Sequence, residues 1–200
     1  MVEDVVRRLE GYRPKRLQPV LPLPQAAVLI PLTRSEQPEL ILTRRAEALS
    51  THAGEVAFPG GRRDPCDSDL LHTALRESQE EVGLDPHCVQ VAGSLIQLVS
   101  RHGIEVTPYV GIVPQGLNYC ANIDEIDSIF SVPLEFFAED VRETTHRIDY
   151  LGKSWYVPSY RFHEYKIWGL TAVMVVELVN LLYDRRLRLD VPPSLSKKEL

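Results

Sequence analysis

Apolar residues recur along the chain with two periods, one typical of strands and one typical of helices. Runs of apolar, β-branched residues at 26–33 and 39–45 are separated by the turn-rich segment SEQP and therefore predict a β-hairpin. Similar runs predict further strands at 55–58, 89–99, 105–114, 147–151 and 155–158. Strand follows strand in most of these places, so the sequence does not indicate the βαβ alternation of a doubly wound sheet.

Helical spacing of apolar residues marks three other segments. The N-terminal residues 1–16 predict a short amphipathic helix, and residues 167–186 predict an apolar helix that closes the domain. A third helix is expected over 68–82, where Gly83 would end it. The positions of this helix that we expect to face the core are Leu71, Leu75 and Val82.

These elements together predict an α+β fold, an α/β/α sandwich built on a mixed β-sheet. Residues 122–137 are rich in acids at their start and predict a loop that leads into a short helix. We expect a helix and an extended, proline-rich lead-in over 1–25, a single domain over 26–190 and a tail over 191–200.

Composition and charge narrow the class of protein. A chain that is 44% hydrophobic and 25% charged has the composition of an ordinary globular protein. Its net charge of −6 offers no basic surface, so no nucleic-acid partner is expected. The three cysteines lack a CxxC spacing, which argues against disulfides and zinc and fits a reducing cytoplasm. No signal peptide is recognisable, and the apolar run at 170–183 is too short to cross a bilayer, so no membrane partner is expected.

The stretch RESQEEVGL at 76–84 places three glutamates, Glu77, Glu80 and Glu81, within five positions. On a helix, Glu77 lies one turn before the other two, so the three carboxylates converge on one face. Like charges at this spacing repel each other, and either water or a cation has to offset the repulsion. A solvated acidic face is the common outcome for such a cluster taken alone.

The surrounding residues carry a family resemblance. Gly60-Gly61, the acidic loop that follows and RESQEEVGL together resemble the Nudix box, G-x(5)-E-x(7)-R-E-U-x-E-E-x-G-U. Two positions depart from the pattern. Ser78 replaces an apolar residue, and Asp67 stands where glutamate is expected and one residue further from Arg76, which leaves the partner of Arg76 open.

A second signature points to one subfamily. ILTRRA at 41–46, Gly54 and FPGG at 58–61 resemble the signature of the coenzyme A pyrophosphatases of the Nudix superfamily, and GGRRDPCD at 60–67 matches the loop GGxxDxxD that these enzymes commonly carry. The later segments SVPL and YKIWGLTA are also similar to that subfamily, so the resemblance spans roughly 26–184.

The resemblance implies a Nudix-type fold and a metal-dependent hydrolase that cleaves the pyrophosphate of coenzyme A or its thioesters to 3′,5′-ADP and (acyl-)4′-phosphopantetheine. Its partner is then a small molecule and its cofactor Mg²⁺ or Mn²⁺, since attack on a phosphoanhydride requires cations that neutralise the phosphate oxygens. Two alternatives stay open. One is a Nudix pyrophosphatase for ADP-ribose, another nucleoside diphosphate derivative or capped RNA, and the other is a non-catalytic nucleotide-binding module.

Family resemblance also proposes residue roles at the metal site. Glu77 and Glu81 are the first metal ligands, Glu80 is the third, and a backbone carbonyl at the glycine turn, at Gly61, could add a ligand. Arg76 is expected to orient the acidic face through a charge-assisted bond. Glu125 is a candidate extra ligand or base, because Nudix enzymes often use an acid from a later loop, although loop 122–127 could simply be solvated.

Substrate contacts are expected from basic residues near the glycine turn. Arg44 and Arg45 suit a phosphate, although strand neighbours alternate sides and one of the two should point away. His52 and Lys166 are further candidates, each with a surface role as the ordinary alternative. Ser50 stands where the subfamily signature has a second arginine. The sequence leaves open a possible homodimer, the physiological metal, which glutamate acts as base, and the choice between free and acylated coenzyme A.

Overall fold

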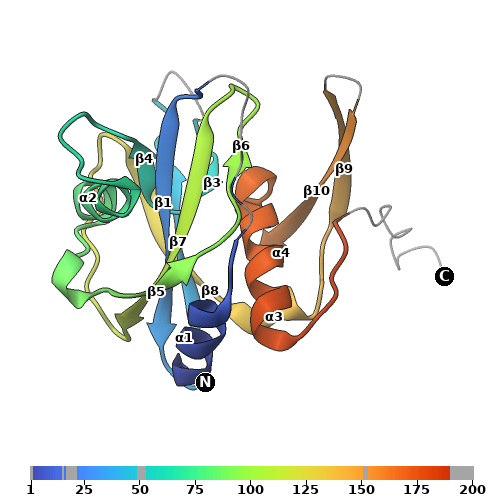
Figure 1. Cartoon of the computed structure of the whole chain (residues 1–200), viewed down its shortest axis with the longest axis horizontal. Helices are drawn as coiled ribbons and strands as arrows, with labels where there is room; N and C mark the ends of the chain where they lie inside the picture. The colour runs from blue at the N-terminus through green and yellow to red at the C-terminus, as the bar shows by residue number, and fades with distance from the viewer. Residues whose placement is uncertain (1, 15, 17–21, 49–52, 151–152, 190–200) are drawn as a thin grey trace.

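The computed structural model describes residues 2–14, 16, 22–48, 53–150 and 153–189. Among these residues, eight strands form one mixed sheet whose main path runs β3-β2-β1-β7-β5 (Figure 1). At its centre, β1 (Gln25–Arg34) and β7 (Glu105–Pro114) pair in parallel over their whole length. β1 also pairs antiparallel with β2 (Glu39–Arg45), which confirms the predicted hairpin.

Shorter strands complete this sheet, and a second sheet lies beside it. The remaining strands of the main sheet are β3 (Val56–Ala57), β4 (Gly60–Arg62), β5 (Gln90–Ser94), β6 (Leu98–Val99) and β8 (Ile126–Pro133). The second sheet has the order β11-β10-β9 and consists of β9 (Thr144–Tyr150), β10 (Lys153–Phe162) and β11 (Tyr165–Ile167). The long run predicted at 89–99 is therefore two strands, β5 and β6.

Helices cover both faces of the main sheet. On one face α2 (Leu70–Val82) packs on β1 through Ala27, Leu29 and Val82. The other face carries α1 (Val2–Gly11), α3 (Leu134–Ala138) and α4 (Gly169–Tyr183), and the second sheet lies beyond α4 (Figure 1). The result is the predicted α+β sandwich. No helix of the described residues is long and apolar enough to span a membrane.

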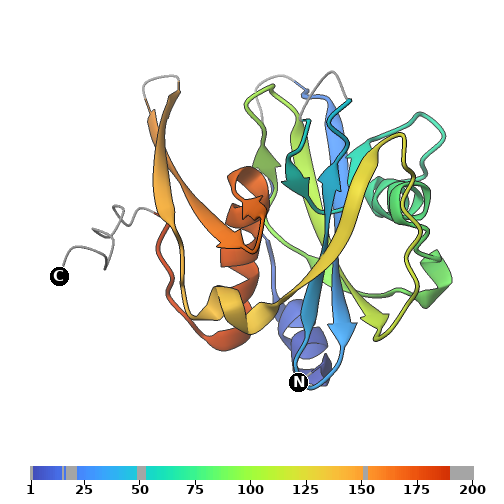
Figure 2. The same cartoon turned by 180° about the vertical axis from the view of Figure 1, so that it is seen from behind.

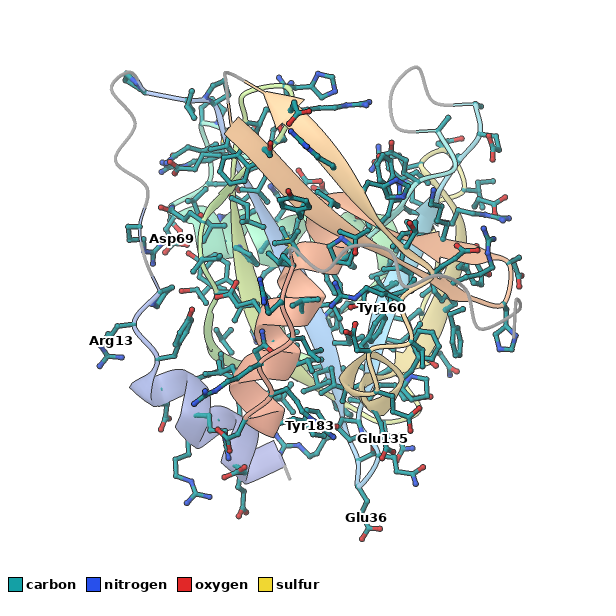
Figure 3. The ribbon with its side chains drawn as sticks, turned by 90° about the vertical axis from the view of Figure 1, so that its right-hand side faces the viewer. Arg13, Glu36, Asp69, Glu135, Tyr160 and Tyr183 are labelled. Carbon is teal, nitrogen blue, oxygen red and sulfur yellow. The ribbon has the colours of Figure 1, made fainter. Side chains whose placement is uncertain are left out.

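Aromatic and aliphatic side chains join the second sheet to the helices. Tyr160 of β10, labelled in Figure 3, is fully buried. Its ring meets that of Phe137 of α3 edge-on, with centroids 5.2 Å apart. α1 also belongs to this core, because Val5 and Leu9 are almost completely buried in it. The N-terminal helix therefore packs on the body of the protein, and the domain boundary at 25/26 stays a prediction.

Capping residues define where helix α2 begins and ends. Asp69 caps its start, accepting a hydrogen bond of 2.8 Å from the backbone N–H of His72. Gly83 ends it in the left-handed conformation, as predicted, with φ of 68°. Its buried residues include Ala74, Ser78 and Val82, whereas the predicted core residues Leu71 and Leu75 are only half-buried.

One prediction about the secondary structure is wrong. Residues 126–133, expected to be a loop before a short helix, form strand β8, which pairs antiparallel with β2 along its length (Figure 2). The acidic loop is confined to the residues before Ile126, and the predicted short helix is α3. A β-bulge between Arg44 and Arg45 leaves Asp127 as an extra residue in β8, at the end of the pair closest to the glycine turn.

Candidate active site

Glu81 is the most deeply placed of the three glutamates. Only 3% of the residue is exposed, and its carboxylate accepts hydrogen bonds from the backbone N–H of Gly60 at 3.0 Å and from Arg45 Nη1 at 3.2 Å. Burial raises the pKa of Glu81 to about 7, and the neighbouring charges of Glu77 and Glu125 act in the same direction, against the Gly60 N–H and Arg45. The carboxylate is thus held in place while its charge is only partly compensated.

Glu77 lies one helical turn before Glu81 and faces the glycine turn. A Cβ atom added at Gly61 would stand 2.5 and 2.6 Å from the two carboxylate oxygens of Glu77, so only glycine leaves room for them. Gly60 is equally constrained, because a Cβ there would meet the backbone of Val28 at 2.6 Å. Burial raises the pKa of Glu77, opposed by the adjacent Arg76 and supported by the charges of Glu80 and Glu125.

Arg76 has a defined partner, which the sequence had left open. Its guanidinium donates to both carboxylate oxygens of Asp67, from Nε at 2.9 Å and from Nη2 at 3.0 Å. The third nitrogen, Nη1, lies 2.9 Å from Glu77 Oε1 and 2.9 Å from Glu80 Oε2. Arg76 therefore makes the charge-assisted bonds expected of it. Glu80 is the most exposed of the three glutamates, with 55% of its side chain accessible.

Asp67 was not among the predicted site residues. Its side chain is fully buried and accepts further hydrogen bonds from Thr73 Oγ1 at 2.8 Å and from the backbone N–H of Asp64 at 2.9 Å. Arg76 is the largest cause of a pKa of Asp67 well below its usual range. The sequence did contain a signal that could have identified Asp67 as a site residue, because it stands where the Nudix box has its first glutamate.

Glu125 approaches the same place from the loop before β8. The loop is fixed to α2 because the backbone N–H of Asn122 donates to the carbonyl of Glu81 at 2.9 Å. It is fixed to β2 because the backbone N–H of Ala46 donates to the carbonyl of Glu125 at 2.8 Å. Asn122 Nδ2 donates to the Glu125 carboxylate at 3.3 Å. Glu125 thus adds negative charge beside Glu77 and Glu81 without an arginine partner among the described contacts.

The basic residues proposed for substrate binding divide into two groups. Arg45 contacts Glu81, on the α2 side of the sheet. Arg44 instead pairs with Asp127, with its Nε 2.7 Å from Oδ2, and its guanidinium carbon lies 5.6 Å from the ring centroid of Tyr165. Lys166 is exposed, with Nζ 5.4 Å from the ring centroid of Trp168. His52 and Ser50 fall outside the described residues.

The donor chemistry of the site fits a hard divalent cation. Glu77 and Glu81 bring carboxylate oxygens to one partly desolvated place, Glu125 adds to the negative charge there, and the missing side chain at Gly61 lets the Glu77 carboxylate lie against the glycine turn. The described residues do not hold a preformed cluster of three or more His, Cys, Asp or Glu ligands. Glu77 Oε1 and Glu80 Oε2 each lie 2.9 Å from Arg76 Nη1.

Two cavities lie elsewhere in the described part of the chain. One, of about 400 Å³, is lined by the end of α1 and by Ala92, Gly93 and Ser94. The other, of about 330 Å³, lies between Tyr12, Ile96 and α4. Neither includes a glutamate of the α2 site. The chemistry is therefore assigned from the carboxylate geometry and not from the size of a cavity.

Comparison with known proteins identifies the family. The NUDIX domain family matches residues 23–135, which is more than half of the chain. The chain belongs to this family and is a Nudix hydrolase, which confirms the predicted fold class. Two similar proteins are the "Uncharacterized Nudix hydrolase NudL" of Enterobacter sp. (strain 638), 41% identical over 88% of this chain and 92% of that protein, and the NudL of Salmonella paratyphi B, 39% identical over 96% of each.

Solved structures with a similar fold are more distant in sequence. An Ap4A hydrolase of C. elegans is 18% identical, with a TM-score of 0.48 over 57% of this chain and 83% of that one. The NUDIX domain of Shewanella oneidensis NrtR, solved with ADP ribose, is 20% identical, with a TM-score of 0.46 over 66% of this chain and 85% of that one.

Proposed function

We propose that this Nudix hydrolase cleaves the pyrophosphate of coenzyme A or its thioesters, giving 3′,5′-ADP and (acyl-)4′-phosphopantetheine. Nudix hydrolases generally use divalent metal cations and act on small nucleotide substrates, and Mg²⁺ or Mn²⁺ is the proposed cofactor here. The choice of coenzyme A is supported by the linked signatures at 41–46 and 58–61. Three cysteines without disulfides, Cys66, Cys88 and Cys120, support a cytoplasmic location.

One observation carries the hydrolytic part of the proposal. The Glu81 carboxylate is buried, is held by the Gly60 N–H and lies one helical turn from Glu77, so two carboxylates share one partly desolvated place whose negative charge a cation would offset. A solvated acidic face does not bury its carboxylates in this way. The same three glutamates argue against a non-catalytic binding module, which has no need of them.

Each residue has a proposed role. Glu77 and Glu81 hold the cation, and Glu80 and the Gly61 carbonyl are further candidate ligands. When bound, the cation neutralises phosphate oxygens and lowers the pKa of a water molecule. Arg76 positions Glu77 and Glu80 through its bond to Asp67. Glu125 is the proposed extra ligand or base.

A substrate panel tests this function. Purified protein would be supplied with Mg²⁺ or Mn²⁺ and with coenzyme A, acyl-coenzyme A, dephospho-coenzyme A, ADP-ribose, NADH and diadenosine polyphosphates, and the products would be identified by mass. We expect coenzyme A or a thioester to give the highest kcat/KM, with 3′,5′-ADP as one product. Highest efficiency on ADP-ribose would favour the first alternative, and binding without turnover of any compound would favour the second.

Glutamate variants test the site itself. Glu77→Gln and Glu81→Gln are expected to lower turnover by at least about 100-fold, since even residues that only support metal ligands are worth about 10–100-fold. Metal binding, followed by calorimetry, should weaken in parallel while the circular dichroism spectrum stays unchanged. Glu36→Gln is the matched control, because Glu36 is exposed in the β1–β2 turn, away from α2 (Figure 3). Full activity in both site variants would refute the metal-site assignment.

A further inference from the structure

Among the described residues, the outer strand of the second sheet is paired along one edge only. β9 pairs with β10 from Thr144 opposite Ser159 to Tyr150 opposite Lys153, and it is the terminal strand in the order β11-β10-β9. The β9–β10 hairpin extends away from the main sheet and places β9 at the outside of the molecule (Figures 1 and 2). The backbone N–H and C=O groups along such an edge can pair with another strand.

One face of this hairpin carries exposed apolar side chains. Ile148 of β9 and Trp155 of β10 are register partners, so they lie side by side on the same face. Their exposed fractions are 42% and 58%, which is unusual for an isoleucine next to a tryptophan. Toward the base of the hairpin, His146 lies on the same face and is half-buried, with its ring 5.9 Å from that of Trp168. The apolar surface is therefore confined to the outer half of the hairpin.

The opposite face of β9 carries two opposite charges. Arg147 and Asp149 flank Ile148 in the chain and point to the other side of the sheet, where their side chains are 61% and 63% exposed. They form an ion pair of 3.0 Å along the strand, and Ser154 Oγ donates to Asp149 at 2.6 Å. The strand therefore has a basic residue on one side of Ile148 and an acidic residue on the other. A second copy of the strand running in the opposite direction would present an acid opposite the base and a base opposite the acid.

We propose that β9 pairs antiparallel with β9 of a second copy of this chain, about a two-fold axis at Ile148. In this register each Arg147 lies directly opposite Asp149 of the other copy, so two cross-strand charge pairs form. On the other face, the two Ile148 side chains meet at the axis and each Trp155 flanks them. The two small sheets then join into one continuous sheet, and the exposed apolar strip is covered on both copies.

Neighbouring registers are less favourable. In a symmetric antiparallel pair, residues directly opposite each other point to the same face of the sheet. The two-fold axis must therefore pass through one residue of β9, and the other possible registers place it at a different residue. An axis at Arg147 places the two arginines opposite each other, and an axis at Asp149 does the same for the two aspartates. Like charges directly opposite each other destabilise a strand pair. The register at Ile148 avoids both repulsions.

Sedimentation velocity over a concentration series tests the proposal. A single pair of strands forms a small interface, so we expect a reversible dimer whose population rises between about 1 μM and 1 mM. Arg147→Asp places two acids on β9, and Asp149→Arg places two arginines there. Each variant alone should repel its own copy and weaken dimerisation by at least about 10-fold. Arg34→Asp, the same charge change on the main sheet, should leave the dimer unchanged.

Mixing the two variants is the decisive experiment. A chain with two acids on β9 is complementary to a chain with two arginines, so an equimolar mixture of the Arg147→Asp and Asp149→Arg proteins should form a heterodimer that neither forms by itself. An effect limited to the ion pair within one strand cannot produce this rescue between chains. A wild-type protein that stays monomeric throughout, a dimer insensitive to both changes, or a mixture that does not associate would each overturn the proposal.

Discussion

Arg76 of helix α2 and Asp67 of the preceding loop are joined by two hydrogen bonds, of 2.9 and 3.0 Å, between the guanidinium and both carboxylate oxygens. The pair closes the acidic loop onto the helix, because Asp67 is also bonded to Thr73 and to the backbone of Asp64. It leaves Nη1 of Arg76 free to reach the Glu77 carboxylate. The loop thereby controls the direction of a carboxylate in the candidate metal site.

Asp67→Asn is expected to destabilise the protein at neutral pH. The substitution keeps the size of the side chain but removes a buried charge that Arg76 compensates, and the expected loss of unfolding free energy is about 2–4 kcal/mol. Urea denaturation of both proteins at pH 7 measures the difference. The double variant Asp67→Asn with Arg76→Gln should lose much less unfolding free energy than the sum of the two single variants. Each single substitution leaves the remaining member of the pair without its partner, and the double variant does not.

The same pair gives a pH dependence with a definite sign. Arg76 holds the folded-state pKa of Asp67 below its unfolded value of about 3.9, so the contribution is fully present above that value and is lost as the pH falls through the folded pKa. The stability difference between wild type and Asp67→Asn should therefore be constant from pH 7 to about pH 5 and shrink below about pH 4. A difference that is the same at pH 3 and pH 7 would contradict the depressed pKa.

Gly60→Ala is expected to lower mainly stability, and Gly61→Ala mainly activity. A methyl group at Gly61 meets only the end of the Glu77 side chain, which can turn aside, so we expect an unfolding free energy within about 1 kcal/mol of wild type and activity lower by about 10–100-fold. A methyl group at Gly60 meets backbone and adds a strained φ of 155°, so stability should fall by about 2–4 kcal/mol. Thermal unfolding and turnover, measured on both variants, separate the two effects.

Tyr12→Phe tests how α1 is held on the body of the protein. Tyr12 Oη donates to Glu177 Oε1 of α4 at 2.7 Å, and the same oxygen accepts from the backbone N–H of Ile96 at 2.9 Å. Removing the hydroxyl takes one donor from a carboxylate whose pKa burial already raises, and we expect a loss of about 1–2 kcal/mol in urea denaturation. Tyr119→Phe is the contrasting control, since the buried Tyr119 hydroxyl has no hydrogen-bond partner among the described residues, and its removal should be neutral or stabilising.

The parts of the fold that the sequence predicts are those fixed by local patterns. The β1–β2 hairpin follows from two apolar runs around a turn, and α2 from helical spacing that ends at Gly83. β8 was missed because the segment IDSIFSVP follows two acids, carries a third at Asp127 and lacks a regular alternation. Its strand form depends on pairing with β2, which is 80 or more residues away in the chain. The division into two sheets has the same origin in long-range pairing.

The candidate site shows a similar division. Family resemblance and helical spacing place Glu77, Glu80 and Glu81 on one helix. They do not rank the three by burial, which depends on how α2 lies against the glycine turn. Nor do they give Arg44 its partner, because a bulge in β8 brings Asp127 to it. Contacts between segments distant in sequence decide these details.

A last prediction concerns recognition of the 3′-phosphate that distinguishes coenzyme A from dephospho-coenzyme A. Arg44, whose side chain is 34% exposed, and the exposed Lys166 of β11 are the proposed contacts. If they bind this phosphate, kcat/KM for coenzyme A should exceed that for dephospho-coenzyme A by about 10-fold, less than a buried charged hydrogen bond would give, and the ratio should fall as salt rises. Arg44→Ala and Lys166→Ala should each bring the ratio closer to one, while the control Arg34→Ala, at an exposed arginine of β1, should not.

Substitution of Asp127 is expected to change the same substrate preference in the opposite direction. Its carboxylate now neutralises the Arg44 guanidinium, so Asp127→Asn releases positive charge at the place where the phosphate is proposed to bind. The preference for coenzyme A over dephospho-coenzyme A should therefore increase in Asp127→Asn and return to the Arg44→Ala level in the double variant. A ratio unchanged in all of these variants would remove Arg44 from substrate recognition and leave its pair with Asp127 as a bond that joins β2 to β8.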